Sequence, residues 1–237
     1  MEKPVDNVDK PQKPSSSDRL SPSPALARKS ALLTLTLLKQ AYPAATCALC
    51  HASPWQLLVA TILSAQCTDQ RVNQVTPALF ARFPDPASLA GAAAAEVEGL
   101  IRSTGFFRNK TASLIGCARA VTDCHRGLVP QTMAELVALP GVGRKTANVL
   151  LGNAFGVPGM VVDTHVGRVA RRLGWARAGQ PVGVERELCR LLPPACWTGT
   201  SHVLIWHGRA CCRALTAHCS ICPVRERCPR VGVVRSR

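Results

Sequence analysis

The sequence predicts an all-α protein. Aromatic residues make up only 4% of the 237 residues, and no run of alternating β-branched residues indicates a strand. Signals that open helices recur instead. Ser53 followed by Pro54 is typical of an N-cap with proline at the first helical position, and Thr68 followed by Asp69 starts another helix. A hydrophobic content of 47% is enough for a sizeable core.

Further helices are expected over residues 109–120 and from Asp163, which caps its helix, to Gly174. A hairpin lies between these two helices. Thr132 and Glu135 have the spacing of a capping box, in which each side chain satisfies the other residue's backbone amide, and they open a short helix.

The turn of this hairpin follows at residues 140–143. Pro140 cannot extend the short helix, and Gly141 and Gly143 permit backbone angles that other residues resist. The sequence therefore predicts a helix, a tight turn and a second helix.

The charge of the chain points to a polyanionic partner. A net charge of +15 and a pI near 9.9 favour nucleic acid, and the alternative is a solvated basic surface. No apolar stretch is long enough for a membrane span and no secretory signal is found, so we expect an intracellular protein, cytoplasmic or in the nucleoid if bacterial. Residues 1–28, rich in proline and serine, are expected to be a flexible tail, and residues 231–237 a basic C-terminal tail.

The hairpin offers a binding site for phosphate. Backbone amides at the start of its second helix are unpaired, and the helix dipole favours an anion there. The residues expected to contact DNA in this way are Gly141, Val142, Gly143 and Arg144. Such a contact positions a protein on DNA without reading its sequence. The alternative is an ordinary helix hairpin.

An amine and a carboxylate follow at the starts of successive helices. Lys145 lies in the first turn of the second hairpin helix, whose positive end disfavours a cation, so the nucleophilic free amine is easier to reach. Asp163 could accept its proton or stabilise positive charge on a sugar. Two structural alternatives stay open: Lys145 as a phosphate clamp, and Asp163 as only an N-cap.

Four of the twelve cysteines form a C-x6-C-x2-C-x5-C array, which consists of Cys212, Cys219, Cys222 and Cys228. Four thiolates joined by short loops can bind one metal centre, and the spacing alone leaves zinc and an iron–sulfur cluster both open. Cys211 is interpreted as a bystander. The arginines around the array are expected to face DNA, with a solvated charge run as the alternative; these are Arg213, Arg225, Arg227 and Arg230.

Three segments together resemble the endonuclease III family of DNA repair glycosylases: Leu139–Ala147, Val162–His165 and Leu63–Gln66. The resemblance runs from about residue 29 to residue 230. It implies a six-helix domain over 47–157 and a second domain, combining 29–46 with 158–230, that carries the cysteine array. The DNA groove and the catalytic pocket would lie between the two domains.

The same resemblance assigns roles to single residues. Lys145 would attack the sugar C1′ and form a Schiff base, Asp163 would assist, and base release would be followed by β-elimination. The array would bind a [4Fe–4S] cluster. Gln66 would fill the gap left by an extruded nucleotide, and Phe106 would be the wedge against the opposite strand. The alternatives are a polar helix-end residue for Gln66 and a core side chain for Phe106.

The substrate class also follows from the resemblance. The adenine-removing branch of the family has a catalytic glutamate where this chain has Ala60, and it lacks the lysine that matches Lys145. We therefore expect a monomeric, bifunctional glycosylase and abasic-site lyase that removes oxidised pyrimidines from duplex DNA. Two other interpretations are a monofunctional glycosylase and a non-catalytic, DNA-binding or redox-sensing iron–sulfur protein.

Overall fold

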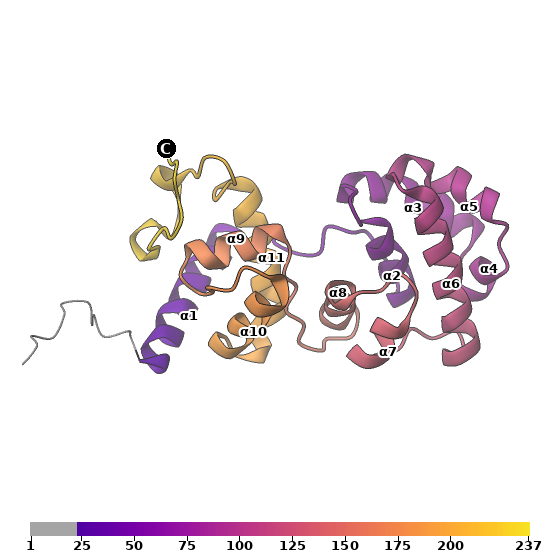
Figure 1. Ribbon diagram of the computed structural model, residues 1–237, viewed down its shortest axis with the longest axis horizontal. Coiled ribbons are helices and arrows are strands. Elements are labelled where there is room, and N and C mark those ends of the chain that lie inside the picture. The colour runs from indigo at the N-terminus through magenta and orange to yellow at the C-terminus, as the bar shows by residue number, and fades with distance from the viewer. Residues whose placement is uncertain (1–22) are drawn as a thin grey trace, which may run out of the picture.

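The structure is a computed structural model that describes residues 23–237, so the greater part of the expected N-terminal tail lies outside the described residues. Within them the chain is helical, and the one β contact is an isolated bridge between Ala217 and Ser236. Buried hydrophobic side chains form two separate clusters, which correspond to the two lobes in Figure 1. The prediction of an all-α protein is confirmed.

The first lobe contains the seven α-helices that follow one another from residue 54 to residue 154. These are α2 (Pro54–Leu63), α3 (Asp69–Arg82), α4 (Pro86–Ala90), α5 (Ala94–Ile101), α6 (Phe107–His125), α7 (Met133–Ala138) and α8 (Arg144–Ala154). The expected number was six, which is wrong because Gly91 ends α4 and the alanine-rich stretch then starts the separate helix α5. The apolar helix α2 lies in the middle of the core, and eight of its side chains are buried.

The second lobe is built from two distant parts of the chain. Its helices are α1 (Pro24–Ala41), α9 (Thr164–Arg172), α10 (Pro181–Leu191) and α11 (Trp197–Ala210). Helix α1 therefore packs with helices that come more than 120 residues later (Figure 1). The C-terminal loop after α11 closes this lobe.

The expected N-terminal tail needs correction, and the C-terminal residues are bonded to the rest of their lobe. The flexible tail cannot extend to residue 28, because the Ser23 hydroxyl accepts a hydrogen bond from the Leu26 amide and caps α1 from Pro24 onward. The basic C-terminal residues 231–237 form backbone hydrogen bonds with the segment at Ala217. The Arg237 amide donates to the Ala217 carbonyl over 2.9 Å, and the Ala217 amide donates to the Arg235 carbonyl over 3.1 Å.

The helix starts follow the expected chemistry. The hydroxyls of Ser53 and Thr68 each accept a hydrogen bond from the amide three residues later, over 3.2 Å. At α7 only half of the capping box forms. The Thr132 hydroxyl accepts from the Glu135 amide and donates over 2.6 Å to the Glu135 carboxylate, which therefore bonds the hydroxyl instead of the Thr132 amide.

The hairpin turn depends on one glycine. Gly141 has φ of +78°, and an added Cβ would lie 2.7 Å from the Cβ of Ser113 on α6. Gly143 has φ of −96° and ψ of 174°, an extended conformation that any residue adopts. The expectation that both glycines use unusual backbone angles is therefore wrong for Gly143.

Helix α8 connects the lobes, because it belongs to the first core and contacts the second lobe along its length. At its start the Arg144 guanidinium forms bidentate hydrogen bonds of 2.7–3.1 Å with the Glu185 carboxylate of α10. Near its end the Asn153 amide oxygen lies 2.7 Å from Nε2 of His202 on α11. Between them, Gly152 permits a close approach, since its Cβ would lie 2.5 Å from the Thr198 hydroxyl.

The substitution Gly141→Ala tests the turn. We expect it to lower the free energy of unfolding by about 2 kcal/mol, because alanine resists a positive φ and would contact Ser113. Thermal or urea unfolding measures this change. The matched control is Gly143→Ala, whose added Cβ would lie in open space. It should lower the free energy of unfolding by less than about 1 kcal/mol, because alanine is a poorer N-cap than glycine. Equal losses in the two variants would contradict this account of the turn.

Candidate active site and metal-binding site

Lys145 is the second residue of α8, and its side chain is exposed. The N-cap of this helix is Gly143, which supplies no side-chain hydrogen bond. The backbone amides of the first turn therefore have no capping acceptor in the described chain, and a phosphate can bind there. No protein atom lies within 4 Å of where a Cβ on Gly143 would be, so the backbone is open to a ligand on that side.

Asp163 caps α9, as the sequence predicted. Its Oδ1 accepts a hydrogen bond of 2.8 Å from the Val166 amide, and the side chain is half-buried. This is the one hydrogen bond to the carboxylate within the described part of the chain. The cap uses one oxygen, so the carboxylate can serve the helix and a ligand together.

The structure brings Lys145 and Asp163 together. Both line one cavity of about 250 Å³, to which both lobes contribute. The first lobe supplies the starts of α3 and α8 and the segment after α2, including Gln66. The second lobe supplies one face of α11, whose lining residues are spaced as on a single side of a helix: Ser201, His202, Ile205, Trp206 and Arg209.

The two residues expected to enter the DNA helix share an unusual conformation. Gln66 and Phe106 are both exposed, with left-handed φ values of 51° and 48°. The Phe106 side chain is 64% exposed, so the alternative of a core phenylalanine is wrong. Gln66 lines the cavity, whereas Phe106 lies outside it, at the start of α6. Such backbone angles are uncommon for residues other than glycine, and strained positions of this kind cluster at active sites and ligand-binding sites.

Two other hairpin residues, Val142 and Arg144, use their side chains for contacts within the protein. Val142 is 6% exposed and packs in the first core, so any DNA contact there is through its backbone. The Arg144 guanidinium already bonds Glu185, and that hydrogen bond raises the pKa of Arg144. Arg144 therefore connects the lobes, a role that sequence spacing did not reveal.

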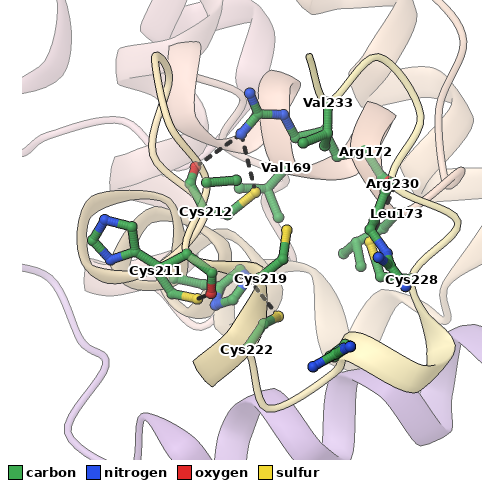
Figure 2. A pocket seen from close by; sticks show the side chains of 14 residues that line it. Val169, Arg172, Leu173, Cys211, Cys212, Cys219, Cys222, Cys228, Arg230 and Val233 are labelled. Atoms are coloured by element: carbon green, nitrogen blue, oxygen red, sulfur yellow. Dashed lines mark hydrogen bonds between the residues drawn. The ribbon is translucent and has the colours of Figure 1, made fainter. Parts of the chain in front are cut away.

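The four cysteines of the array line a second cavity, in the C-terminal loop of the second lobe (Figure 2). Cys212, Cys219, Cys222 and Cys228 surround a common space backed by the apolar side chains of α9. Cys211 also lines this space, but it is buried and its thiol donates to the His218 carbonyl over 3.2 Å. Of the four arginines expected to face DNA, Arg225 and Arg230 line the cavity, and Arg213 and Arg227 are exposed outside it.

The surroundings favour the thiolate at Cys212 and Cys222, whereas burial raises the pKa of Cys228. Arg172, which is buried, donates from Nη1 to the Cys212 sulfur over 3.4 Å. Burial alone would raise the pKa of Cys212, but hydrogen bonds from His207 and Arg172 lower it. The pKa of Cys222 falls to about 4, because Cys211 and, after it, His207 lie close enough to its sulfur to stabilise the thiolate. Since thiolates are the form that binds metal, this donor set fits a thiolate-bound metal centre.

Three residues behind the array were not expected from the sequence. Arg172 and His207 contact its sulfur atoms, and the Tyr42 hydroxyl lies 3.0 Å from Nδ1 of His207. Tyr42 comes from the end of α1, so α1 contributes to the surroundings of the array. No motif marks these residues, because they reach the array only through the folding of separate helices.

Across the described residues, no helix combines the length and the apolar character needed to cross a membrane.

Comparisons with known proteins identify the family of this chain. Residues 59–194 match the family model of the HhH-GPD superfamily base excision DNA repair proteins. Endonuclease III of Synechocystis sp. is 53% identical, over 82% of this chain and 90% of that protein, and the enzyme of Escherichia coli K12 is 39% identical, over 82% and 92%. A solved trapped covalent intermediate of endonuclease III with DNA has a TM-score of 0.81 at 40% identity, over 86% of this chain and 96% of that one. The chain belongs to the endonuclease III family of base excision repair DNA glycosylases.

Proposed function

We propose that this chain is a bifunctional DNA glycosylase and abasic-site lyase in which Lys145 is the nucleophile. The observation that carries the proposal is the shared cavity of Lys145 and Asp163 between the lobes, at the starts of two helices. A similar protein has been solved as a trapped covalent intermediate with DNA, which supports a mechanism through a covalent bond. A non-catalytic DNA-binding protein would need no such pair.

In the proposed reaction the Lys145 amine attacks C1′ of the damaged nucleotide and the base leaves. Asp163 stabilises the positive charge that develops on the sugar, and its free carboxylate oxygen accepts a proton. Lys145 then forms an imine with the opened sugar, and β-elimination breaks the strand on the 3′ side. A monofunctional glycosylase, in contrast, would leave the abasic strand intact.

Duplex DNA is the proposed substrate because three features of the chain suit it. The net charge is +15, the hairpin presents uncapped amides to a phosphate, and Gln66 and Phe106 are exposed in constrained conformations. The damaged nucleotide must leave the stack to reach Lys145. Gln66, which lines the cavity, would fill the gap, and Phe106 would contact the opposite strand.

Oxidised pyrimidines are the proposed lesions. Ala60 is fully buried in α2 and provides no carboxylate, whereas Lys145 is present. This combination differs from that of the adenine-removing branch in both positions.

We further propose that the array binds a [4Fe–4S] cluster through Cys212, Cys219, Cys222 and Cys228. Four cysteine sulfurs that line one cavity, with Arg172 and His207 as hydrogen-bond donors, are a fitting donor set. When bound, the cluster would cross-link the C-terminal loop and could exchange an electron. The exposed Arg213, Arg225 and Arg227 would place positive charge near DNA.

Borohydride trapping tests the nucleophile. With a duplex that contains one thymine glycol, wild type should form a covalent complex and Lys145→Ala should form none. Lys145→Arg, which keeps the charge but cannot form an imine, should bind DNA and also fail to trap. A trapped complex in either variant would exclude Lys145 as the nucleophile. If wild type traps only on a preformed abasic site, the lyase stands and the lesion class is wrong.

Substitution of Asp163 separates its two roles. Asp163→Asn should keep the cap, because asparagine also caps well, and lower the turnover rate by about 10²-fold or more. Asp163→Ala should lose both turnover and about 1 kcal/mol of stability. Rates and thermal unfolding of the two variants provide the comparison. An Asn variant with full activity and lower stability would leave Asp163 as only a cap.

Metal analysis tests the cofactor. The purified protein should be brown and contain about four iron atoms per chain. Replacing Cys219 with serine should lower the iron content, whereas Cys124→Ser, at an exposed cysteine far from the array, should not. One zinc per chain in place of iron would overturn the cluster assignment.

A further inference from the structure

The cavity that contains Lys145 has an aromatic wall. Helix α11 turns one face toward the cavity, and Trp206 on that face is 39% exposed. The other three tryptophans are covered. Trp55 is 6% exposed, Trp175 packs against the second core, and the indole of Trp197 donates to the Leu192 carbonyl. Within the described residues the indole N–H of Trp206 has no hydrogen-bond partner.

Exposed aromatic side chains are rare in this chain. Its four tryptophans, one tyrosine and five phenylalanines all lie within the described residues. Phe106 and Trp206 are the two that are exposed, and of these only Trp206 lines the cavity. An exposed indole lacks the stabilisation that burial of a large apolar surface gives. Its place in the wall of the cavity that Lys145 also lines therefore indicates a surface that a ligand covers.

Two contacts hold the part of α11 that carries Trp206 against the first lobe. One turn before Trp206, His202 contacts Asn153 of α8 over 2.7 Å. Three residues after it, Arg209 forms an ion pair of 2.9 Å with Asp69 of α3. Both partners belong to the first lobe, so this part of α11 is tied to the first lobe on either side of Trp206. A platform tied in this way can orient a planar ligand.

We propose that Trp206 is the surface on which the extruded base stacks, and that it sets the preference of this enzyme among damaged pyrimidines. The inference rests on the proposed function, because it requires an extruded nucleotide at Lys145. The base is the one aromatic part of a nucleotide, and the face of an indole attracts a planar π-system. Trp206 therefore acts on base release and not on the cleavage of an abasic sugar.

This role implies an order of substrates. A pyrimidine that keeps its C5–C6 double bond, such as 5-hydroxyuracil, is planar and can stack over its whole area. A pyrimidine saturated at that bond, such as 5,6-dihydrouracil, is puckered and stacks less well. Loss of the indole should therefore cost the planar lesion more than the saturated one.

The experiment compares kcat/KM of base release for Trp206→Ala and Trp206→Phe on duplexes with one of these two lesions, beside strand cleavage at a preformed abasic site. For Trp206→Ala, kcat/KM of base release should fall on the order of 10- to 100-fold on 5-hydroxyuracil and by less on 5,6-dihydrouracil. Strand cleavage at the abasic site should fall by less than about twofold, because no stacked base exists there. Trp206→Phe, which keeps an aromatic face, should recover the greater part of the loss. Thermal unfolding checks that both variants are folded.

Other outcomes would overturn the proposal. Equal losses on both lesions and on the abasic site would make Trp206 a structural or DNA-backbone residue. No loss on either lesion would show that the base does not contact it. If Trp206→Phe is as impaired as Trp206→Ala, stacking is not the interaction. If wild type does not cleave the abasic site, the proposed function itself is wrong. If wild type cleaves it and only the predictions for Trp206 fail, the proposed function stands and this inference is wrong.

Discussion

The position of the candidate active site depends on one contact, between the buried Glu185 carboxylate and helix α8. Glu185 is 9% exposed, and it accepts hydrogen bonds from Arg144 and from the Asn148 amide, both on α8. Glu185 belongs to the second lobe, whereas α8 packs in the first core. A carboxylate removed from water requires such partners, because an unpaired buried charge is costly. This contact therefore fixes how the first turn of α8 sits against the other lobe, and Lys145 is the residue directly after Arg144.

The two residues proposed to be catalytic, Lys145 and Asp163, lie at the starts of helices that begin in opposite ways. Helix α8 begins at Gly143 without a capping side chain, so its first amides are open to a phosphate and Lys145 stands beside them. Helix α9 begins at Asp163, whose carboxylate satisfies the Val166 amide. One helix start thus attracts an anion, and the other supplies one. Both helix starts line the same cavity. In the proposed reaction, a nucleotide bound by its phosphate at α8 would therefore have the Asp163 carboxylate nearby when positive charge develops on its sugar.

The sequence predicted what depends on neighbouring residues. The caps at Ser53, Thr68 and Asp163 were found because capping is chemistry over three residues, and the bend at Gly141 was found because proline and glycine act locally. The expected tail extends too far for a similarly local reason. The signal at Ser23 and Pro24, where α1 starts, is hidden by the tail-like composition of the residues before it. The contacts of Arg144 with Glu185 and of Arg209 with Asp69 join residues 41 and 140 positions apart, so no spacing rule could reveal them.

The exposed or buried state of an aromatic residue was equally beyond the sequence. Phe106 and Phe107 are neighbours, yet Phe106 is exposed in a left-handed conformation and Phe107 packs against the first core as α6 begins. Which of the two faces solvent depends on the direction in which α6 leaves the preceding turn, and the packing of the whole lobe sets that direction.

Helix α9 joins the two functional regions of the second lobe. Asp163 lies at its start, and near its end the buried Arg172 donates to the Cys212 sulfur and to the carbonyls of Arg213 and Ala214. The chain returns once more to this helix end, where the Val231 amide donates to the Arg172 carbonyl. A guanidinium with several acceptors in a fixed geometry resists rotation more than a single hydrogen bond would. The cysteine loop is therefore bonded to the helix that begins at Asp163. In the proposed reaction, a cluster bound at the array would support the position of Asp163 through α9 without contact with the substrate.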